Sequence, residues 1–512
     1  MESFPRLTAV LEIGSTGIRL VIAELAAGGK WRVLDQAGKP VALGRDVFTS
    51  GQVSRESLLE CLLVLQSFRE LLKSWGIAGG DVHVIATSAL RAARNRDVFV
   101  DRVRQETGFP IVIVEGIEEN RLMYLAVRFA LKDDFPRFWR TNSMIIEIGG
   151  GSTEIMLLRR GKMAAAHSLR LGTILIDRQS GRTFGSVWSQ DRYLNDNVRN
   201  TSEFLSMEME LARVRTVVMA GADARYLASG VGKELNEQCR IIERDAYIQF
   251  VEKIRDYRPE ECVQKLHVPY ADSEGFVPGN LLYKLFLQRT AAAQVLVPCV
   301  SIREGLLIDL AAGVDGELQE EFFSQIIASA VNLGRKYRYD EPHSRHVAGL
   351  CRILFDALVR EHGMNRRERM MLEAAALLHD IGMFIQGAGH NKHGQYIVAN
   401  SEIFGLRRDE LDVIANVIRY HRGAPPSSMD VDYLSLQRED RILVLKMASI
   451  LRVADALDRG HTQRISRVTV ERKPEAVVLH TESRYDLTPE RIGLEEKADL
   501  FQNVFGYTVI IT

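Results

Sequence analysis

The chain has 512 residues, of which 46% are hydrophobic and 26% charged, a composition typical of globular proteins. Its net charge of −1 excludes a general attraction to polyanions, so a polyanionic ligand would have to bind at local basic patches such as Arg159, Arg160 and Lys162. No apolar run reaches the ~20 residues that cross a bilayer, the N-terminus lacks a signal-like core, and five scattered cysteines form no CxxC pair. We therefore expect a cytoplasmic protein of several domains without a membrane partner.

The most informative feature is a sequence segment that occurs in two related copies, LTAVLEIGSTGIRLVIAEL at residues 7–25 and NSMIIEIGGGSTEIMLLRRG at residues 142–161. Each copy predicts a strand, a tight turn and a second strand, with Glu12 or Glu147 at the edge of a glycine-rich loop. Small residues let backbone N–H groups approach an anion, and a nearby carboxylate can hold a divalent cation. Each loop is therefore a candidate phosphate site, and two such loops could hold one phosphate chain from both sides.

In chain order, residues 1–125 alternate strand-like runs with a helical segment that closes on Gly76, and residues 126–312 repeat this alternation. From residue 313 the apolar spacing is helical almost throughout. The tail regains β-branched runs. We predict two α/β domains at 1–125 and 126–312, an all-α domain at 313–465 and a short α+β appendage at 466–512.

Five segments, one of them within the second copy of the repeat, carry a family resemblance: ATSALRAARN (86–95), VEGIEENRLMYLAV (114–127), IIEIGGGSTEI (145–155), SLRLG (168–172) and SIREGLLIDL (301–310). In their order and spacing the chain resembles the exopolyphosphatase and guanosine pentaphosphate phosphatase (Ppx/GppA) family. The resemblance implies duplicated actin-like ATPase domains of the ASKHA, ribonuclease H-like kind. It also implies an acid anhydride hydrolase that uses Mg²⁺ to release terminal phosphate from inorganic polyphosphate or guanosine pentaphosphate (pppGpp).

Hydrolysis of a terminal phosphoryl group requires neutralised charge on the phosphate oxygens and a positioned water. The family match selects Glu119 as the residue that orients this water and Arg91 as a phosphate contact. The expected metal carboxylates are Glu12, Glu147 and Glu154. The expected phosphate-binding residues are those of the two loops: Gly14, Ser15, Thr16, Gly149, Gly150, Gly151, Ser152 and Thr153.

This chain departs from the family at both loops, where the family normally carries aspartate in place of Glu12 and Glu147. Glutamate reaches about 1.5 Å further, and a misplacement of roughly 1 Å can lower a rate on the order of 10²-fold. Two interpretations follow: a concerted re-spacing that still binds metal, or a retired site that retains phosphate binding. A second departure is AGADAR at residues 220–225, where a Gly-Thr loop would be usual.

The helical region carries a second constellation of metal-ligating residue types, in the order His343, His379, Asp380, His393, His421 and Asp455. This order resembles that of HD-type metal-dependent phosphohydrolases, and the segment from His393 to Gly423 is similar to the HD-type diadenosine tetraphosphate hydrolases. Such ligands suit two ions of Fe, Mn or Zn. His390 and Lys392 lie outside the pattern, where they either meet a phosphate or belong to a polar loop.

The leading hypothesis is a hydrolase of polyphosphate or pppGpp with its site between the two α/β domains. One alternative places the chemistry in the HD-type domain, acting on a nucleotide or phosphoester, with the N-terminal half sensing phosphate. Another is a non-catalytic binder of polyphosphate or alarmone. We expect a homodimer that does not bind DNA.

Overall fold

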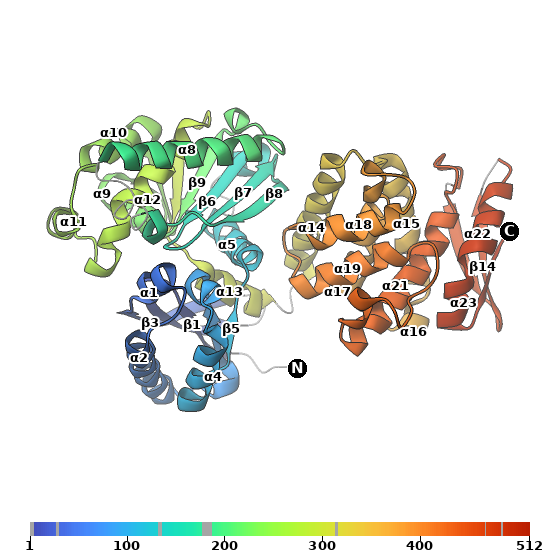
Figure 1. Ribbon diagram of the computed structural model, residues 1–512, viewed down its shortest axis with the longest axis horizontal. Coiled ribbons are helices and arrows are strands. Elements are labelled where there is room, and N and C mark those ends of the chain that lie inside the picture. The colour runs from blue at the N-terminus through green and yellow to red at the C-terminus, as the bar shows by residue number, and fades with distance from the viewer. Residues whose placement is uncertain are drawn as a thin grey trace. The chain divides into compact units, whose positions relative to one another are not determined.

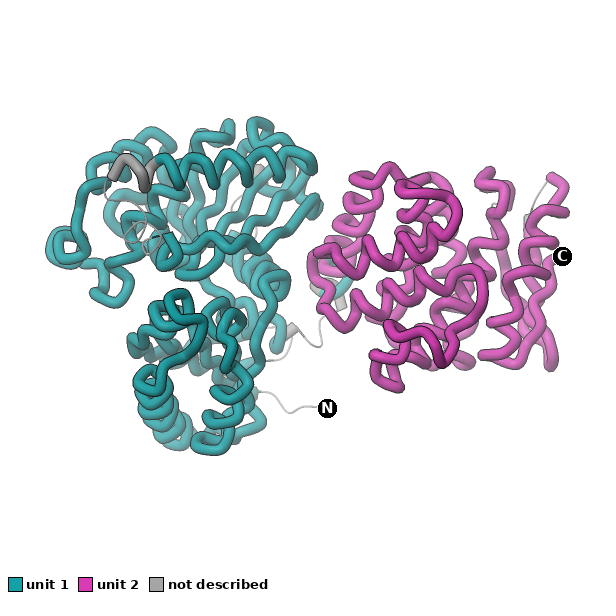
Figure 2. Tube along the Cα trace, viewed as in Figure 1, with its two compact units in different colours: residues 1–321 teal, residues 322–512 magenta. Residues whose placement is uncertain are grey.

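The computed structural model describes residues 5–26, 30–131, 136–176, 187–312, 316–465, 467–482 and 485–512. The chain divides into two compact units, residues 1–321 and 322–512 (Figure 2). Within the described residues, no helix combines the length and the apolar character that a membrane crossing requires.

The first sheet of unit 1 has five strands in the order β3-β2-β1-β4-β5. β1 (Arg6–Ile13) pairs antiparallel with β2 (Gly17–Ala26), which pairs antiparallel with β3 (Lys30–Pro40). On its other side β1 pairs parallel with β4 (Val82–Ala86), which is followed by β5 (Ile111–Ile113).

The second sheet repeats this order of strands. Its order β8-β7-β6-β9-β12 matches β3-β2-β1-β4-β5, with the same antiparallel and parallel pairings. The sequence repeat is therefore a duplicated α/β unit, as predicted. The strands are β6 (Ser143–Ile148), β7 (Thr153–Arg159), β8 (Lys162–Leu169), β9 (Thr216–Ala220) and β12 (Gln294–Pro298), with β10 (Lys233–Asn236) and β11 (Cys239–Glu243) added at the edge.

Helices cover both sheets (Figure 1). The helical segment predicted to close on Gly76 is α2, which ends at Ser74, and Gly76 adopts the left-handed conformation with φ 68°. In the described part of unit 1 the helices and short 3₁₀ turns are α1 (Leu43–Ser50), α2 (Arg55–Ser74), η1 (Gly79–Asp81), α3 (Ser88–Ala92), α4 (Arg96–Thr107), α5 (Gly116–Leu131), α6 (Pro136–Arg140), α8 (Val187–Ser206), η2 (Leu211–Arg213), α9 (Ala222–Val231), α10 (Arg244–Ile254), α11 (Pro259–Leu266), α12 (Tyr270–Gln288) and α13 (Ile302–Ala312).

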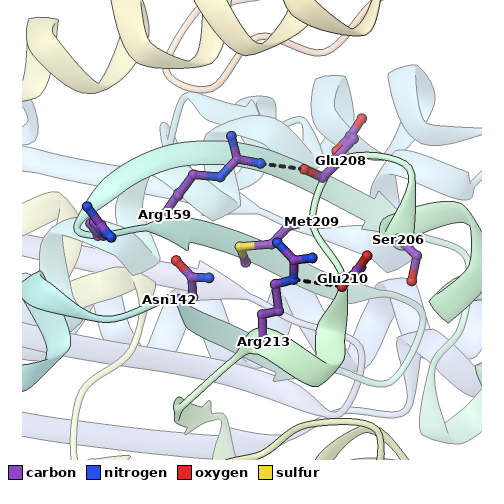
Figure 3. Close-up of a pocket in the computed structure, with 8 residues that line it drawn as sticks. Asn142, Arg159, Ser206, Glu208, Met209, Glu210 and Arg213 are labelled. Atoms are coloured by element: carbon purple, nitrogen blue, oxygen red, sulfur yellow. Dashed lines mark hydrogen bonds and ion pairs between the residues drawn. The ribbon is translucent and has the colours of Figure 1, made fainter.

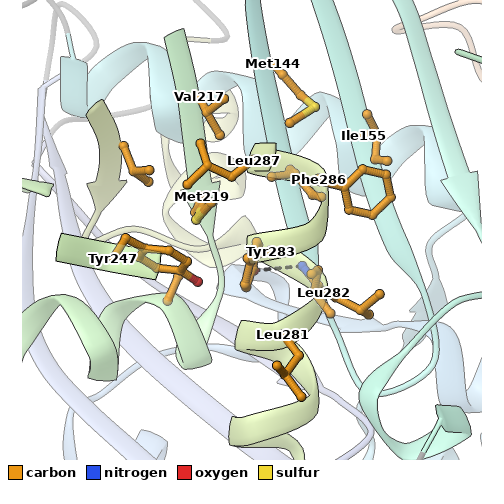
Figure 4. Packing of buried hydrophobic residues seen from close by; sticks show 14 of the residues in the cluster. Met144, Ile155, Val217, Met219, Tyr247, Leu281, Leu282, Tyr283, Phe286 and Leu287 are labelled. Atoms are coloured by element: carbon orange, nitrogen blue, oxygen red, sulfur yellow. Dashed lines mark hydrogen bonds between the residues drawn. The ribbon is translucent and has the colours of Figure 1, made fainter. Parts of the chain in front are cut away.

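The core of the second sheet forms against α12, and Figure 4 shows Tyr283, Phe286 and Leu287 of this helix facing apolar side chains of β6, β7 and β9. Tyr283 is fully buried, and its hydroxyl accepts a hydrogen bond from Ile148 N at 2.9 Å while donating to Ala220 O. Because these are the last residues of β6 and β9, the tyrosine fixes the sheet edge from which the second glycine-rich loop emerges.

Two helices join the two sheets. α5 packs on β7 and β8, α13 packs on β1, β2 and β3, and the two helices pack against each other. A Cβ at Gly305 of α13 would lie 2.0 Å from Leu122 O of α5, so only glycine permits this approach. Arg303, near the start of α13, lies 3.5 Å from Glu12 Oε2, beside the first glycine-rich loop.

Unit 2 is helical over the described residues from its start to 465, as the apolar spacing predicts. α15, α17 and α19 pack against α21, and α15 packs closely with α17, as α18 does with α19. The elements are α14 (Gly316–Lys336, which begins in unit 1), α15 (Glu341–Ala357), α16 (Val359–His362), α17 (Arg366–Leu378), η3 (Ile381–Phe384), α18 (His390–Ala399), α19 (Arg408–Tyr420), α20 (Val431–Leu434) and α21 (Arg438–Ala456).

The C-terminal appendage is a three-stranded sheet with two helices. β13 (Arg467–Arg472) pairs antiparallel with β14 (Ala476–Glu482), which pairs parallel with β15 (Thr508–Ile511). α22 (Thr488–Lys497) and α23 (Asp499–Phe505) pack on α21. The predicted boundary at 125 lies within α5, and the boundaries at 312 and 465 adjoin residues 313–315 and 466, which lie outside the described part of the chain.

Candidate functional site

Both glycine-rich segments form tight turns between paired strands. Gly14 N donates to Gly17 O at 2.9 Å in the first turn, and Gly149 N donates to Ser152 O at 2.9 Å in the second. Glu12 and Glu147 each stand one residue before the end of the strand that enters the turn. The two copies therefore place equivalent carboxylates at equivalent positions.

The two loops meet within unit 1. A Cβ at Gly150 would lie 3.0 Å from the Cβ of Ser15, so the second loop needs glycine to approach the first. Ser15 is buried, its carbonyl accepts from Gly44 N at 2.8 Å, and its hydroxyl lies 3.2 Å from that of Ser88. On its far side, the second loop abuts the SLRLG segment, where a Cβ at Gly172 would lie 2.4 Å from Gly150 O. The predicted phosphate-binding residues are thus brought together from separate sheets.

A polar network ties the first loop to α12. Thr16 Oγ1 donates to Asp272 Oδ1 at 3.3 Å, and Arg19 Nη2 lies 3.4 Å from the same oxygen. Tyr226 donates to the other oxygen at 3.0 Å. The hydroxyl predicted to bind phosphate thus already serves an interaction between the two halves of unit 1.

The two residues predicted to be catalytic are in direct contact. Arg91 Nη1 donates to Glu119 Oε1, and it also donates to Val114 O at 2.6 Å, which fixes the guanidinium. Glu119 lies in the first turn of α5 and is only 6% exposed. The arginine is therefore oriented by the carboxylate that we predict to be the base.

Three neighbouring carboxyl groups, of Glu119, Glu147 and Glu154, raise one another's pKa. Burial and the charges of Glu154 and Glu12 raise the pKa of Glu119 to about 8, against the opposing effect of Arg91. Burial, Glu119 and Glu12 likewise raise the pKa of Glu147 to about 8, and burial with Glu147 raises that of Glu154 to about 7. The side chains are close enough for each to disfavour the next one's charge, so the cluster is short of positive charge.

The residues present fit a divalent cation. Glu147 Oε2 is buried without a hydrogen-bond partner, although a carboxylate oxygen in such a place normally has one. Ser168 donates to Glu154 at 2.9 Å, and Arg303 lies 3.5 Å from Glu12 Oε2. In the described part of the chain these glutamates do not form a group of three whose oxygens lie within 4.8 Å of one another. Carboxylates short of positive charge are nevertheless the ligands that Mg²⁺ prefers.

The raised pKa of Glu147 predicts a pH-dependent stability. The folded chain keeps this proton up to about pH 8, whereas the unfolded chain releases it near pH 4.5, so the free energy of unfolding falls between these values. In EDTA we expect Glu147→Gln to exceed wild type in stability by several kcal/mol at pH 8.5 and nearly to match it at pH 4.5. Urea denaturation at both pH values checks this, and equal stability at pH 8.5 would contradict the assigned environment.

Several neighbours of this cluster lie within the family motifs, although the sequence alone gives these residues no role. Ser88 lies in ATSALRAARN, Ser168 in SLRLG and Arg303 in SIREGLLIDL. The AGADAR segment supplies Asp223, whose pKa rises to about 7 because of burial and the charge of Asp272. Asp272 itself lies in no motif that we recognised, and no local signal marks it.

The basic patch of Arg159 and Arg160 lies elsewhere. With Arg213 it lines a pocket of about 450 Å³ (Figure 3). Arg159 donates to Glu208 O at 2.9 Å and Arg213 to Glu210 at 2.7 Å. Because the pocket carries both signs of charge, it gives no support to a polyphosphate site there.

Unit 2 brings a second set of predicted ligands together. Asp380 lies within 4.8 Å of His343 and His379 in one group of side chains, and within 4.8 Å of His390 and His421 in another. Asp455 joins the first group, with Oδ1 3.6 Å from His343 Nε2 and 3.8 Å from His379 Nε2. Asp380 is therefore shared by two adjoining clusters, as in a dinuclear metal site.

The hydrogen bonds of the four imidazoles fix their tautomers. Each Nδ1 lies 2.7–2.9 Å from an oxygen that only accepts, so each Nδ1 carries the proton; the acceptors are Asp458 Oδ2, Ala376 O, Gly387 O and Ile418 O. In the neutral form of each ring, Nε2 then carries the lone pair that faces the cluster. This arrangement, with the outer nitrogen bonded to a carbonyl or carboxylate, is typical of metal-ligating histidines.

The distances between these lone pairs fit bound metal. His343 Nε2 lies 3.2 Å from His379 Nε2, and His390 Nε2 lies 3.3 Å from His421 Nε2. Two imidazole nitrogens bound to one ion at roughly 2.1 Å each lie about 3.0–3.4 Å apart. Burial and the charge of His379 lower the pKa of His421 to about 3, which keeps that ring neutral and able to ligate.

One ligand assignment differs from the sequence prediction. His390, which we placed outside the pattern, faces Asp380 Oδ1 at 3.1 Å, whereas His393 belongs to neither group among the described residues. The reason is helical geometry. His390 opens α18, the helix that packs on η3, and a Cβ at Gly382 of η3 would lie 1.9 Å from His390 O. His393 lies most of a turn further on and is half-buried.

Comparison with known proteins assigns the chain to a family. A model of the Ppx/GppA phosphatase family matches residues 21–312, and a model of Ppx/GppA phosphatase domain III matches residues 327–501. The guanosine-5'-triphosphate,3'-diphosphate pyrophosphatase of Photobacterium profundum is 23% identical over 462 residues, which cover 87% of this chain and 86% of that protein. The protein of the same name from Pseudoalteromonas atlantica is 24% identical over 469 residues, with the same coverage.

Among solved structures, an exopolyphosphatase from Cytophaga hutchinsonii superimposes with a TM-score of 0.55 at 18% identity. The match covers 60% of this chain and 99% of that one. This likeness confirms the predicted duplicated actin-like fold.

Proposed function

This chain belongs to the Ppx/GppA phosphatase family, and we propose that it is a phosphoanhydride hydrolase releasing terminal phosphate from inorganic polyphosphate, from pppGpp, or from both. The names of its relatives support this substrate class. One observation carries the proposal: two glycine-rich loops from separate sheets meet, with the cluster of Glu119, Glu147 and Glu154 beside them. Such an arrangement can hold a phosphate chain against carboxylates that bind metal.

Each group then has a role in the reaction. Backbone and hydroxyl donors of the two loops hold the phosphate chain, and Arg91 offsets charge on the terminal phosphoryl oxygens. Glu119 orients the attacking water and accepts its proton, a role that suits a carboxyl group whose pKa lies near the working pH. Glu12, Glu147 and Glu154 would hold Mg²⁺, which neutralises phosphate charge when bound.

Phosphate release from polyphosphate and from pppGpp, measured with Mg²⁺ and with EDTA, tests this proposal. We expect release from at least one substrate with Mg²⁺ and loss of release with EDTA. Tight binding of both substrates without release would instead favour the non-catalytic binder. The cytoplasmic location and the homodimer stay predictions, and sedimentation velocity tests the latter.

The presence of glutamate at both position 12 and position 147 leads to a separate prediction. If both changed together to keep a working site, Glu12→Asp alone should weaken Mg²⁺-dependent release, because one carboxylate oxygen draws back by about 1.5 Å. Adding Glu147→Asp should then recover part of the activity. Initial rates over a range of Mg²⁺ concentrations check this. A gain from the single substitution would contradict a concerted change, and a gain only in the double variant would indicate a retired site.

A second candidate function is supported by the side chains of unit 2. We propose that His343, His379, Asp380 and Asp455 hold one transition-metal ion, and that Asp380, His390 and His421 hold another. The observation behind it is the set of four Nε2 lone pairs that face the two carboxylates. Metals held in this way activate water for hydrolysis of a phosphoester or nucleotide. Elemental analysis of natively purified protein tests for the ions.

A further inference from the structure

The C-terminal appendage places a cation at the metal cluster of unit 2. Lys497, the last residue of α22, donates from Nζ to Asp455 Oδ2. The other oxygen of the same carboxylate, Oδ1, faces His343 Nε2 at 3.6 Å and His379 Nε2 at 3.8 Å. One carboxylate therefore has an imidazole-facing oxygen and a lysine-facing oxygen.

The packing of α22 delivers this lysine to the cluster. A Cβ at Gly493 would lie 3.2 Å from Ala456 O at the end of α21, and Leu494 is buried. Arg459 pairs with Glu496 at 2.6 Å, one residue before Lys497. The helix is thus fixed on α21 (Figure 1), and the lysine side chain is 20% exposed while that of Asp455 is 8% exposed.

A second cation stands at the other end of the cluster. Arg422 Nη1 lies 3.4 Å from His390 Nδ1 and 3.5 Å from His390 Nε2. Lys497 and Arg422 therefore lie beside different metal groups, one next to Asp455 and the other next to His390. Cations at both ends of a metal cluster match the charge of a phosphate group lying across it.

We propose that Lys497 is a substrate-binding residue of this second site, whose ammonium group binds a phosphoryl oxygen of the phosphate held at the metals. When Asp455 coordinates a metal ion, its negative charge no longer fully neutralises the Lys497 ammonium group. A phosphoryl oxygen of the bound phosphate then serves as the second anionic acceptor for that ammonium. The appendage is then part of the site. This inference rests on the second candidate function proposed above.

The recognised chemistry is an anionic phosphoryl group, which pppGpp and inorganic tripolyphosphate both carry. The experiment uses the full chain with Glu119→Gln, so that release from the site of unit 1 is suppressed. In this background we compare Lys497→Met, Lys497→Gln and Lys497→Arg. Lys473→Met serves as control, because Lys473 lies in the same appendage with its side chain 52% exposed.

Three measurements are made: metal content, the Kd for inorganic phosphate, and phosphate release from both substrates. We expect Lys497→Met and Lys497→Gln to keep their metal and to weaken phosphate binding about 10-fold or more, as for loss of a charged hydrogen bond. KM should rise more than kcat falls, Lys497→Arg should restore part of the affinity, and Lys473→Met should match the parent. If KM rises more for one of the two substrates, that substrate carries the phosphoryl group that Lys497 binds.

An unchanged Kd for phosphate with full metal content would overturn the inference, because Lys497 would then serve only the fold. Loss of metal in Lys497→Met and Lys497→Gln would also overturn it, since the lysine would then act by positioning Asp455. If the parent with Glu119→Gln held no transition metal and released no phosphate, the second candidate function would fail and the inference with it.

Discussion

Replacing Glu119 with glutamine is expected to lower phosphate release from polyphosphate or pppGpp by roughly 10²-fold or more, the effect of losing a positioned base. The amide keeps the size of the side chain and can still accept from Arg91, but it cannot take a proton from water. Since the phosphate loops are untouched, substrate should still bind. Initial rates and equilibrium binding of polyphosphate measure the two effects separately.

The matched control is Glu118→Gln, one residue earlier on α5. Glu118 pairs with Arg121, which also binds Asp309 of α13, so its charge serves the helix pair rather than the cluster. We expect its rate to stay within a few-fold of wild type. Unchanged release in Glu119→Gln would remove this residue from the mechanism, and equal losses in both variants would indicate damage to the helix pair.

The double substitution His379→Ala/Asp380→Ala should abolish transition-metal binding in unit 2. Wild type should retain up to two ions per chain, and the double variant none, because Asp380 belongs to both groups of ligands. The fold of unit 1 should persist, since the substitutions lie in the other compact unit. Elemental analysis gives the metal content, and circular dichroism checks the fold.

Two single variants sharpen this test. His390→Ala should lose one ion, because its Nε2 faces Asp380 and His421, whereas His393→Ala should keep both. The opposite pattern would restore His393 as the ligand that the sequence order suggests. Wild type without bound metal would leave the histidine cluster as a structural feature of the helical core.

Much of the fold follows from the sequence because its signals are local. The repeated strand, turn and strand can be seen in residues 7–25 and 142–161, and the structure places both copies at corresponding positions of two sheets. The glycine-rich turns and the helical spacing of apolar residues in unit 2 are equally local properties of the sequence. The family motifs predict that Arg91 and Glu119 act together at the site, and the two side chains are in contact.

The rest depends on tertiary contacts that no short segment encodes. Asp272 reaches Thr16 across 256 positions of the chain, and Lys497 reaches Asp455 from a separate helix. Which of His390 and His393 reaches the cluster depends on which part of α18 packs on η3. The spacing of the histidines in the sequence does not specify this packing. Side chains that act through such contacts can be assigned only once the packing is known.

The most direct test of the account is phosphate release from polyphosphate and from pppGpp by wild type, Glu119→Gln and His379→Ala/Asp380→Ala. The account predicts that Glu119→Gln loses most of the release from at least one substrate, while the double variant retains it. If the double variant lost this release and Glu119→Gln retained it, the principal site would lie in unit 2, which would contradict the central claim.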